Sequence, residues 1–324
     1  MRTKTINVLV TGVGAIIGYG VIKSIRKSDR PATIIGTDIY NDAVGQHWCD
    51  EFIQAPYAVA DEYIPFLIDV IQRHSIDIVF FGTEQEIYKC IDSRQELGEY
   101  YKRLVINRPE ILQLSRDKWA MQQALIEQGL EKLIIPSVIQ GSYDQISSLW
   151  GSRFLLKPRS SYASKGIHLV DNKKDFDFFK PQMGEGFMAQ KLMGDAEHEY
   201  TVGVFGLGDG SNSGMIQMKR KLSQEGATAK AWTLQDERLT EAVDEICAEL
   251  KPIGPTNMQF RLHEGSYYLL EVNPRISSST SIRAAFGFNE ALMSIDYFLN
   301  GTVTHPYLKD GAAQRFIDEV ITYR

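Results

Sequence analysis

The sequence predicts an α/β domain followed by a small β-rich unit and a mixed α+β domain. In the first hundred residues, apolar strand-like runs alternate with helical patterns. After residue 150, short strand-like segments flank polar loops, and near the end two such segments face each other across a short turn. We therefore expect a Rossmann-like parallel domain over residues 1–115, a small β-rich lid over 116–187 and a C-terminal domain over 188–324.

The N-terminal domain is expected to hold a parallel sheet. Strands are predicted at residues 6–11, 33–38 and 76–82, and helices at 18–27 and 63–74. Uninterrupted apolar strands between helices are typical of a parallel sheet that is covered on both faces.

The rest of the chain has a different pattern. The expected elements are a helix at 116–128 that ends at Gly129, lid strands at 153–157 and 167–170, a strand pair near 189–204, a hairpin of 258–263 with 267–273, and a closing helix at 289–299.

Composition excludes some classes of function. The 324 residues carry a formal net charge of −6, which argues against a dense basic surface for nucleic acid. No long apolar run predicts a membrane span or a signal peptide. Cys49, Cys90 and Cys247 lie far apart in the sequence, so we expect reduced thiols in a cytoplasmic protein.

Glycines follow the first strand at Gly12, Gly14 and Gly18. They permit two interpretations. One is a dinucleotide-binding loop with Asp38 on the ribose, although the spacing fits G-x-G-x-x-G poorly. That interpretation predicts an NAD(P)-dependent reductase with a Tyr-x-x-x-Lys pair on a helix. The other is a tight strand–helix turn, and this stretch alone leaves the two open.

The segment YYLLEVNPR carries polar side chains at the end of an apolar strand. Glu271 and Asn273 project from one face because side chains alternate along a strand. If residues 264–266 form a three-residue loop, Gln259 lies opposite Glu271 on that face. Hard oxygen donors of this kind suit Mg²⁺. The Asn-Pro step then ends the strand and turns Arg275 toward the same site.

A second motif, FLLKPRSSYASKGI, places Lys157 at the end of a buried strand before a loop of small residues. Small side chains let backbone N–H groups approach phosphate oxygens, and the lysine adds a point charge. The sequence therefore predicts a hairpin that covers a phosphate group.

A third motif, AQKLMGDAEHEYTVGVF, follows in the next strand pair. Gln190 and Lys191 can present backbone groups to a purine edge, with Leu192 or Met193 against its face. Glu199 can accept hydrogen bonds from ribose hydroxyl groups.

Together the three motifs resemble the ATP-grasp superfamily and, more narrowly, the short single-unit relatives of the carbamoyl-phosphate synthase large subunit. The match covers nearly the whole chain in the family's order. The resemblance implies that ATP lies between the lid and the C-terminal domain. It also implies that the N-terminal domain contributes to the acceptor-substrate site, so that its glycines mark a fold.

The resemblance implies a role for each matching position. Phosphate contacts are implied for Lys118, Lys157 and the loop with Ser161, Ser164 and Gly166. Adenine contacts are implied for Gln190, Lys191 and Leu192, and a ribose contact is implied for Glu199; Gln259, Glu271 and Asn273 are implied as ligands of two Mg²⁺ ions, with Mn²⁺ as an alternative. Arg275 is implied to act in catalysis, and Lys219 and Arg220 are implied to face phosphate or substrate.

The implied activity is that of an ATP-dependent carboxylate–amine ligase that forms an acyl phosphate and acts on small molecules as a possible homodimer. Candidate substrate contacts are Glu84, Glu86 and Arg283, each with an alternative structural role. Two departures are a loop with a single glycine and the amide Gln259 in place of the commoner acid. They leave a non-catalytic ATP-binding subunit open as an alternative beside the reductase.

Overall fold

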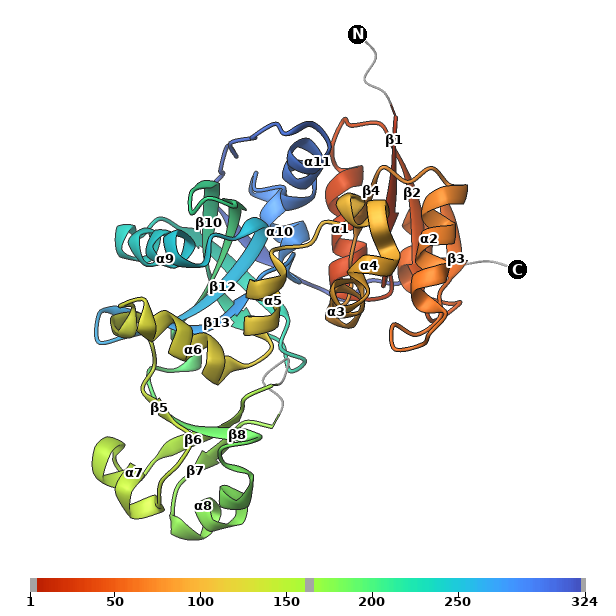
Figure 1. Cartoon of the computed structure of the whole chain (residues 1–324). Helices are drawn as coiled ribbons and strands as arrows, with labels where there is room; N and C mark the ends of the chain where they lie inside the picture. Colours follow the sequence, from red (N-terminus) through yellow and green to blue (C-terminus); the bar gives the residue numbers. More distant parts are fainter. Residues whose placement is uncertain (1–4, 161–165, 322–324) are drawn as a thin grey trace.

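The computed structural model describes residues 5–160 and 166–321, and its strands form three sheets along one chain (Figure 1). Ser161 and Ser164, predicted in the phosphate loop, lie outside the described residues. Within the described ranges, no helix is both long and apolar enough to cross a membrane.

The N-terminal sheet has the order β3-β2-β1-β4, and all three strand pairs are parallel. The parallel sheet is thus confirmed. The elements in this part of the chain are β1 (Ile6–Val10), α1 (Ile16–Arg26), β2 (Ala32–Asp38), β3 (Glu51–Gln54), α2 (Tyr63–Arg73), β4 (Ile78–Phe80), α3 (Glu84–Asp92), α4 (Arg94–Leu97) and α5 (Pro109–Ser115).

Two glycines of the opening stretch have steric roles in the turn from β1 to α1. Gly12 has a φ of +55°, a conformation that L side chains rarely adopt. A Cβ on Gly18 would lie 2.2 Å from the carbonyl oxygen of Gly12, so only glycine lets α1 pack this closely on the loop. Both residues are therefore explained by the fold alone.

The lid sheet has the order β5-β8-β6-β7, and its pairs are antiparallel. Its elements are β5 (Ser137–Val138), α7 (Tyr143–Trp150), β6 (Phe154–Pro158), β7 (His168–Val170), α8 (Lys173–Phe179) and β8 (Phe187–Lys191). Phe154 and Phe176 lie in the small core between this sheet and its two helices. Strand β8 continues the lid sheet to Lys191, beyond the expected boundary at residue 187.

The C-terminal sheet has the order β13-β12-β9-β10-β11-β14. Its strands are β9 (Glu199–Leu207), β10 (Asn212–Leu222), β11 (Thr228–Leu234), β12 (Ile253–His263), β13 (Ser266–Asn273) and β14 (Ala312–Gln314). One face packs against α6 (Lys118–Glu127) and α9 (Glu237–Leu250), which bury Leu125 and Val243 against Val202 and Phe260. Part of the opposite face packs Phe205 and Met218 against Ile282 and Met293 from the end of the chain. The rest of that face carries polar side chains, among them Glu199 and Arg220.

The last helices, α10 (Thr280–Ala285) and α11 (Glu290–Asn300), lie between the C-terminal sheet and the N-terminal domain (Figure 1). Ala291 and Ile295 of α11 share a core with Val8 and Phe80 of the N-terminal sheet. Both faces of that sheet are covered, since α2 packs on the other one. The end of the chain therefore holds the N-terminal domain against the sheet that carries the predicted site.

Short 3₁₀ helices complete the described secondary structure: η1 (Val44–Trp48), η2 (Gly98–Arg103), η3 (Glu131–Leu133), η4 (Lys180–Gln182) and η5 (Ala196–His198).

Candidate functional site

The β12–β13 hairpin places Gln259 directly opposite Glu271, as predicted, but through a different turn. Only Glu264 and Gly265 form the turn, both with positive φ, and His263 pairs with Ser266. The register then shifts between Gln259 and Phe260, which leaves one extra residue on β13. The predicted three-residue loop is therefore wrong, whereas the predicted pair of side chains is confirmed.

Two lysines approach this hairpin from other elements. Lys157, on β6 of the lid, is buried, and its Nζ lies 3.5 Å from the carbonyl oxygen of Leu270. Lys118 Nζ, at the start of α6, lies 3.6 Å from Glu271 Oε1. The pKa of Lys157 is lowered to about 8, chiefly by burial, with Glu271 opposing this shift and Lys118 and Arg261 adding to it. Two positive charges thus lie beside a carboxylate between the lid and the C-terminal sheet.

The position of Lys118 depends on the residue before it. Asp117 caps α6 by accepting hydrogen bonds from the backbone N–H groups of Trp119 and Ala120. It also forms an ion pair with Arg159, which follows the lid strand β6. The backbone N–H of Lys118 donates to the Arg159 carbonyl at 2.9 Å. These contacts tie the end of the lid strand to the start of α6, where Lys118 lies.

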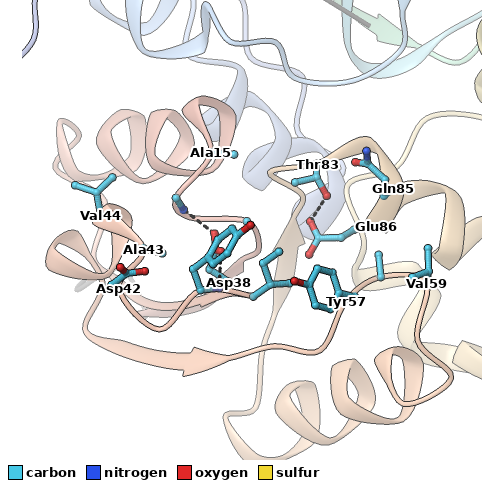
Figure 2. A pocket seen from close by; sticks show the side chains of 15 residues that line it. Ala15, Asp38, Asp42, Ala43, Val44, Tyr57, Val59, Thr83, Gln85 and Glu86 are labelled. Atoms are coloured by element: carbon cyan, nitrogen blue, oxygen red, sulfur yellow. Dashed lines mark hydrogen bonds between the residues drawn. The ribbon is translucent and has the colours of Figure 1, made fainter. Parts of the chain in front are cut away.

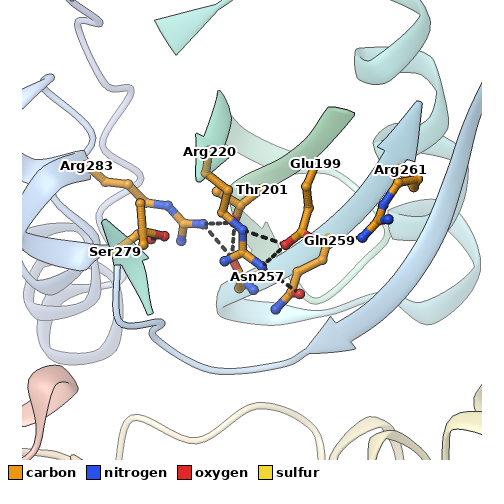
Figure 3. Close-up of polar contacts among 9 residues, drawn as sticks. Glu199, Thr201, Arg220, Asn257, Gln259, Arg261, Ser279 and Arg283 are labelled. Atoms are coloured by element: carbon orange, nitrogen blue, oxygen red, sulfur yellow. Dashed lines mark hydrogen bonds and ion pairs between the residues drawn. The ribbon is translucent and has the colours of Figure 1, made fainter. Parts of the chain in front are cut away.

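Glu199 is engaged by two arginines on the open face of the sheet (Figure 3). Arg220 Nη2 lies 2.7 Å from Glu199 Oε1, and Arg261 Nη2 lies 3.0 Å from Glu199 Oε2. Arg220 also donates to Gln259 Oε1 at 2.8 Å. Arg261 was not predicted as a site residue. It lies two residues after Gln259 on the same strand, so its side chain shares the face of Gln259.

Lys219 does not face this site. It pairs in register with Tyr200, so the two side chains share one face of the sheet, and Tyr200 belongs to the core under the helices. Arg220, its neighbour on β10, projects to the opposite face and contacts Glu199. The prediction that both residues face phosphate or substrate is therefore wrong for Lys219, because adjacent strand residues point to opposite faces.

Two cavities meet at the hairpin. The smaller one, about 110 Å³, lies between the lid and the C-terminal sheet. Its lining includes most of the predicted nucleotide contacts: Lys118, Lys157, Gln190, Lys191, Leu192, Glu199, Gln259 and Glu271. The larger one, about 680 Å³, extends toward the N-terminal domain and is lined in part by Arg220, Gln259, Glu271, Asn273 and Arg275. Gln259 and Glu271 line both cavities.

Gly166 lines neither cavity in the part of the chain that the structure describes. Its φ is +76°, and a Cβ there would lie 2.9 Å from Pro158 Cγ. Glycine is therefore required by the backbone where the loop rejoins the lid sheet.

Arg275 reaches the larger cavity and forms an ion pair with Glu84 of α3, with Nε 2.8 Å from Oε1. Glu84 is one of the two acids that were candidates for substrate contact. The N-terminal domain therefore supplies a charged partner to the predicted catalytic arginine.

Arg283, a second candidate for substrate contact, is fully buried and pairs with Glu290 at 2.8 Å. It also donates to Thr201 Oγ1 at 3.0 Å. A Cβ on Gly203 would lie 2.6 Å from Arg283 Nη1, so the guanidinium packs against bare backbone. The expected alternative, a solvated charge at the start of a helix, is therefore wrong as well, because Arg283 is a buried residue that pairs with Glu290 inside the fold.

The glycine loop of the N-terminal domain has little capacity left for a pyrophosphate. The N–H of Val13 donates to the Thr37 carbonyl at 3.1 Å, and that of Ala15 donates to Gly12 at 2.9 Å. The N–H of Gly14 donates to Asp38 Oδ2 at 2.8 Å. These amides would otherwise bind the anion of a dinucleotide, so the loop supports the strand–helix turn.

The reductase interpretation also requires a tyrosine and a lysine near the glycines. The spacing occurs at Tyr19 and Lys23 of α1. Neither lines the cavity beside the glycine loop, and Lys23 Nζ lies 4.4 Å from the ring centroid of Trp48. The pair is engaged in a cation–π contact outside that cavity.

The three thiols do not form a reactive group. Cys90 and Cys247 are buried, and Cys49 is half-buried. Burial raises the pKa of Cys49 to about 11 and that of Cys247 to about 12, and it also raises that of Cys90. Burial therefore disfavours the reactive thiolate form at all three positions.

The C-terminal part of the chain matches a family described as "ATP-grasp in the biosynthetic pathway with Ter operon", over residues 187–320. The carbamoyl phosphate synthase large chain of Methanosarcina mazei is 24% identical over 224 residues, which are 66% of this chain and 19% of that protein. That of Thermoplasma acidophilum is 24% identical over 220 residues, again 66% and 19%. The chain thus spans about a fifth of the length of these relatives.

Solved structures share the fold. A biotin carboxylase from Campylobacter jejuni, in a β,γ-ATP complex, has a TM-score of 0.73 at 16% identity and covers 94% of this chain and 74% of its own. An N5-carboxyaminoimidazole synthetase from Staphylococcus aureus, complexed with ADP, has a TM-score of 0.69 at 17% identity and covers 97% and 82%. The C-terminal part of the chain is thus similar to an ATP-grasp family, about two thirds of the chain is similar to part of the large chain of carbamoyl phosphate synthase, and the chain as a whole shares the fold of these solved structures.

Proposed function

We propose that this protein is an ATP-dependent ligase that activates a carboxylate as an acyl phosphate for attack by an amine. The observation that carries the proposal is the arrangement of charge where the two cavities meet. Lys118 and Lys157 lie on the lid side of Glu271, and Arg275 lies on the side of the N-terminal domain. Cations on both sides of Glu271 can neutralise the negative charge of a phosphoryl group as it passes from a ligand in one cavity to a ligand in the other.

The smaller cavity is the proposed nucleotide site. Gln190, at the end of the lid sheet, is held by a hydrogen bond from its Nε2 to Ser137 Oγ at 3.1 Å. The exposed side chain of Leu192 and the buried Met193 offer apolar surface to a purine. At about 110 Å³ the cavity is smaller than the ~300 Å³ at which ligand pockets begin. We therefore infer that the lid moves outward when the nucleotide enters.

Glu199 is the proposed ribose contact, with a restriction. Both of its oxygens already accept hydrogen bonds from arginines, which hold the side chain in one orientation. Oε1 accepts from both Nε and Nη2 of Arg220, whereas Oε2 accepts from Arg261 Nη2, so one further donor can bind at Oε2. The arginines therefore orient the acid.

The proposed magnesium site uses hard oxygen donors from the hairpin. Glu271 supplies a carboxylate and Asn273 an amide, which fits the preference of Mg²⁺ for one or two carboxylates beside water and phosphate. Gln259 fits less well, because Arg220 donates to its amide oxygen. No group of three or more His, Cys, Asp or Glu that could hold a metal ion occurs in residues 5–160 and 166–321, so the proposed site relies on amide oxygens as well. Bound Mg²⁺ would neutralise phosphate charge. The proposal includes two such ions, as the resemblance implies.

The chain's own residues would position and neutralise the reactants. A carboxylate oxygen attacks the γ-phosphorus of ATP, the bond to the β-phosphate oxygen breaks, and ADP leaves. The amine then attacks the acyl carbon, releasing inorganic phosphate and a proton. Lys157 and Lys118 stabilise charge on the phosphates, and Arg275 stabilises the transferred group. Phosphorylation is needed because an amine cannot displace oxide from a free carboxylate.

The test is a coupled assay of ADP release over amino acids, dipeptides and small diacids, each with and without an added amine. The ligase predicts ADP release that depends on one carboxylate and inorganic phosphate release that depends on the amine. ATP binding without ADP formation across the panel would instead favour the non-catalytic subunit. Tight NADPH binding would favour the reductase.

The proposed partners are a small-molecule carboxylate and an amine, and the proposed location is the cytoplasm. Sedimentation equilibrium of the protein used in the ADP-release assay tests the homodimer that the resemblance implies.

A further inference from the structure

A separate cavity of about 600 Å³ lies at the carboxyl edge of the N-terminal sheet (Figure 2). It is lined by the loops that follow all four parallel strands, with Gly12 after β1, Ile39 after β2, Tyr57 after β3 and Thr83 after β4. Ligands of open α/β sheets bind at this edge. The volume falls within the ~300–1,000 Å³ of small-molecule pockets, and the proposed ligase site does not use this cavity.

The charges around this cavity all have one sign. Among its described lining residues, none is Lys, Arg or His, and the acids are Asp38, Asp42 and Glu86. Asp38 accepts hydrogen bonds from the backbone N–H groups of Gly14 and Tyr40, at 2.8 and 3.1 Å. Asp38 is thus used in the loop itself, and an anionic ligand would meet repulsion.

Glu86 is buried in the wall without a cationic partner. Its carboxylate accepts hydrogen bonds from Thr11 Oγ1 at 2.6 Å, Thr83 Oγ1 at 2.8 Å and Tyr63 OH at 3.0 Å. No ion pair within residues 5–160 and 166–321 includes it. Burial raises the pKa of the Glu86 carboxyl, while the three hydroxyl donors oppose that rise. A buried carboxylate that lacks a counter-charge is stabilised by any cation that enters the cavity.

The rest of the wall is apolar and aromatic. Ile39, Ala43 and Val44 line one side. Tyr40, Tyr57 and Val59 lie at the rim and are 62%, 61% and 82% exposed, although large apolar side chains are ordinarily covered. Aromatic faces attract organic cations as well as apolar groups.

We propose that this cavity binds an organic ammonium ion with an apolar or aromatic body, its charged nitrogen facing Glu86 and its body against Tyr40 and Tyr57. This site requires no ATP and is independent of the ligase proposal. It lies beside the larger of the two cavities at the β12–β13 hairpin, because Gln85 lines both.

The test uses three probes that share one phenethyl body and differ at the head group: phenethylamine, 2-phenylethanol and 3-phenylpropionate. Binding to the full chain is measured by isothermal titration calorimetry in phosphate buffer, without nucleotide. We expect phenethylamine to bind, the alcohol to bind about tenfold more weakly, and the acid to show no binding. Equal binding of the amine and the acid would overturn the proposal.

Two variants test the location of the site, each with a matched control. Glu86→Gln should weaken phenethylamine binding about tenfold or more, whereas Glu62→Gln, the same change at an exposed position outside the cavity, should not. Ala58→Trp should block the cavity from its rim, whereas Ala60→Trp on the same loop should not. Circular dichroism melts establish that each variant is folded. Undiminished binding to folded Ala58→Trp would contradict the proposal, even if Glu86→Gln failed to fold.

Discussion

Arg275, two residues beyond the end of β13, is paired with Glu84 at the start of α3, with Arg275 Nε 2.8 Å from Glu84 Oε1. The two residues are 191 positions apart in the sequence. Arg275 also donates to the carbonyl oxygen of Ile276 at 3.1 Å. The N-terminal domain thus determines the orientation of an arginine that belongs to the C-terminal domain. Any movement of α3 alters the charge beside the proposed phosphoryl-transfer site.

Glu84→Gln removes the charge of this pair and keeps the size of the side chain. Because Glu84 lines the larger cavity and not the smaller one, we expect kcat to fall about tenfold with little change in the KM for ATP. Steady-state ADP release gives both constants, and Glu62→Gln serves as the control. A rise in the KM for ATP with unchanged kcat would show that Glu84 does not orient Arg275 for catalysis.

Glu271→Ala should abolish substrate-dependent ADP release. It removes the carboxylate of the proposed magnesium site and, with it, the ion pair that Glu271 forms with Lys118 at 3.6 Å. We expect a loss of at least about 10³-fold. The control is Glu264→Ala, whose side chain is 87% exposed in the turn of the same hairpin. Full turnover by Glu271→Ala would be incompatible with the proposed site.

The affinity for ATP should depend on pH through Lys157. Burial lowers its pKa from 10.5 to about 8 in the free protein, so the ammonium group loses its proton as the pH rises through 8. Bound phosphate favours the charged form and raises the pKa again. Since phosphate groups titrate near pH ~6, ATP itself stays ionised in this range.

We therefore expect ATP affinity to be greatest below pH 8 and to fall by up to about tenfold per pH unit above it. Calorimetric titrations at fixed magnesium concentration measure the slope. Lys157→Arg keeps a charge at every pH in this range, so its affinity should be independent of pH. A slope that persists in that variant would assign the titration to another group.

Arg283 and Glu290 should contribute to stability as a buried pair. Both side chains are fully buried, so Arg283→Met leaves an unpaired carboxylate in the core. We expect the free energy of unfolding to fall by about 3–5 kcal/mol. The double variant Arg283→Met/Glu290→Leu should lose much less, as measured by urea denaturation. Additive losses would show that the two residues do not interact.

The elements of the fold were largely predictable, because hydrophobic pattern and glycine spacing are local properties. The strand at Ile78, the hairpin partners Gln259 and Glu271, and the closing helix all appear where the sequence places them. Helix α9 was not predicted, although its apolar residues recur on one face. The turn length of the hairpin was missed because a bulge in the same strand pair, at Leu270, shifts the register by one residue and restores the predicted pairing of Gln259 with Glu271.

Side-chain roles were less predictable than elements. Lys219 and Arg220 are adjacent in the sequence and belong to opposite faces of one strand, and the sequence did not show which face is open. Arg283 looked like a surface charge near a helix start, and only the packing of α10 against Gly203 buries it. The partner of Arg275 comes from a distant domain, which no local pattern encodes.

By itself, the sequence determined the order of strands and helices in each domain. It also determined which polar atoms each motif contains, because these properties follow from neighbouring residues. Only the tertiary structure decided which charges meet. Electrostatic pairing depends on distances of a few ångströms between segments that are far apart in the chain, and those distances arise when the sheets pack together.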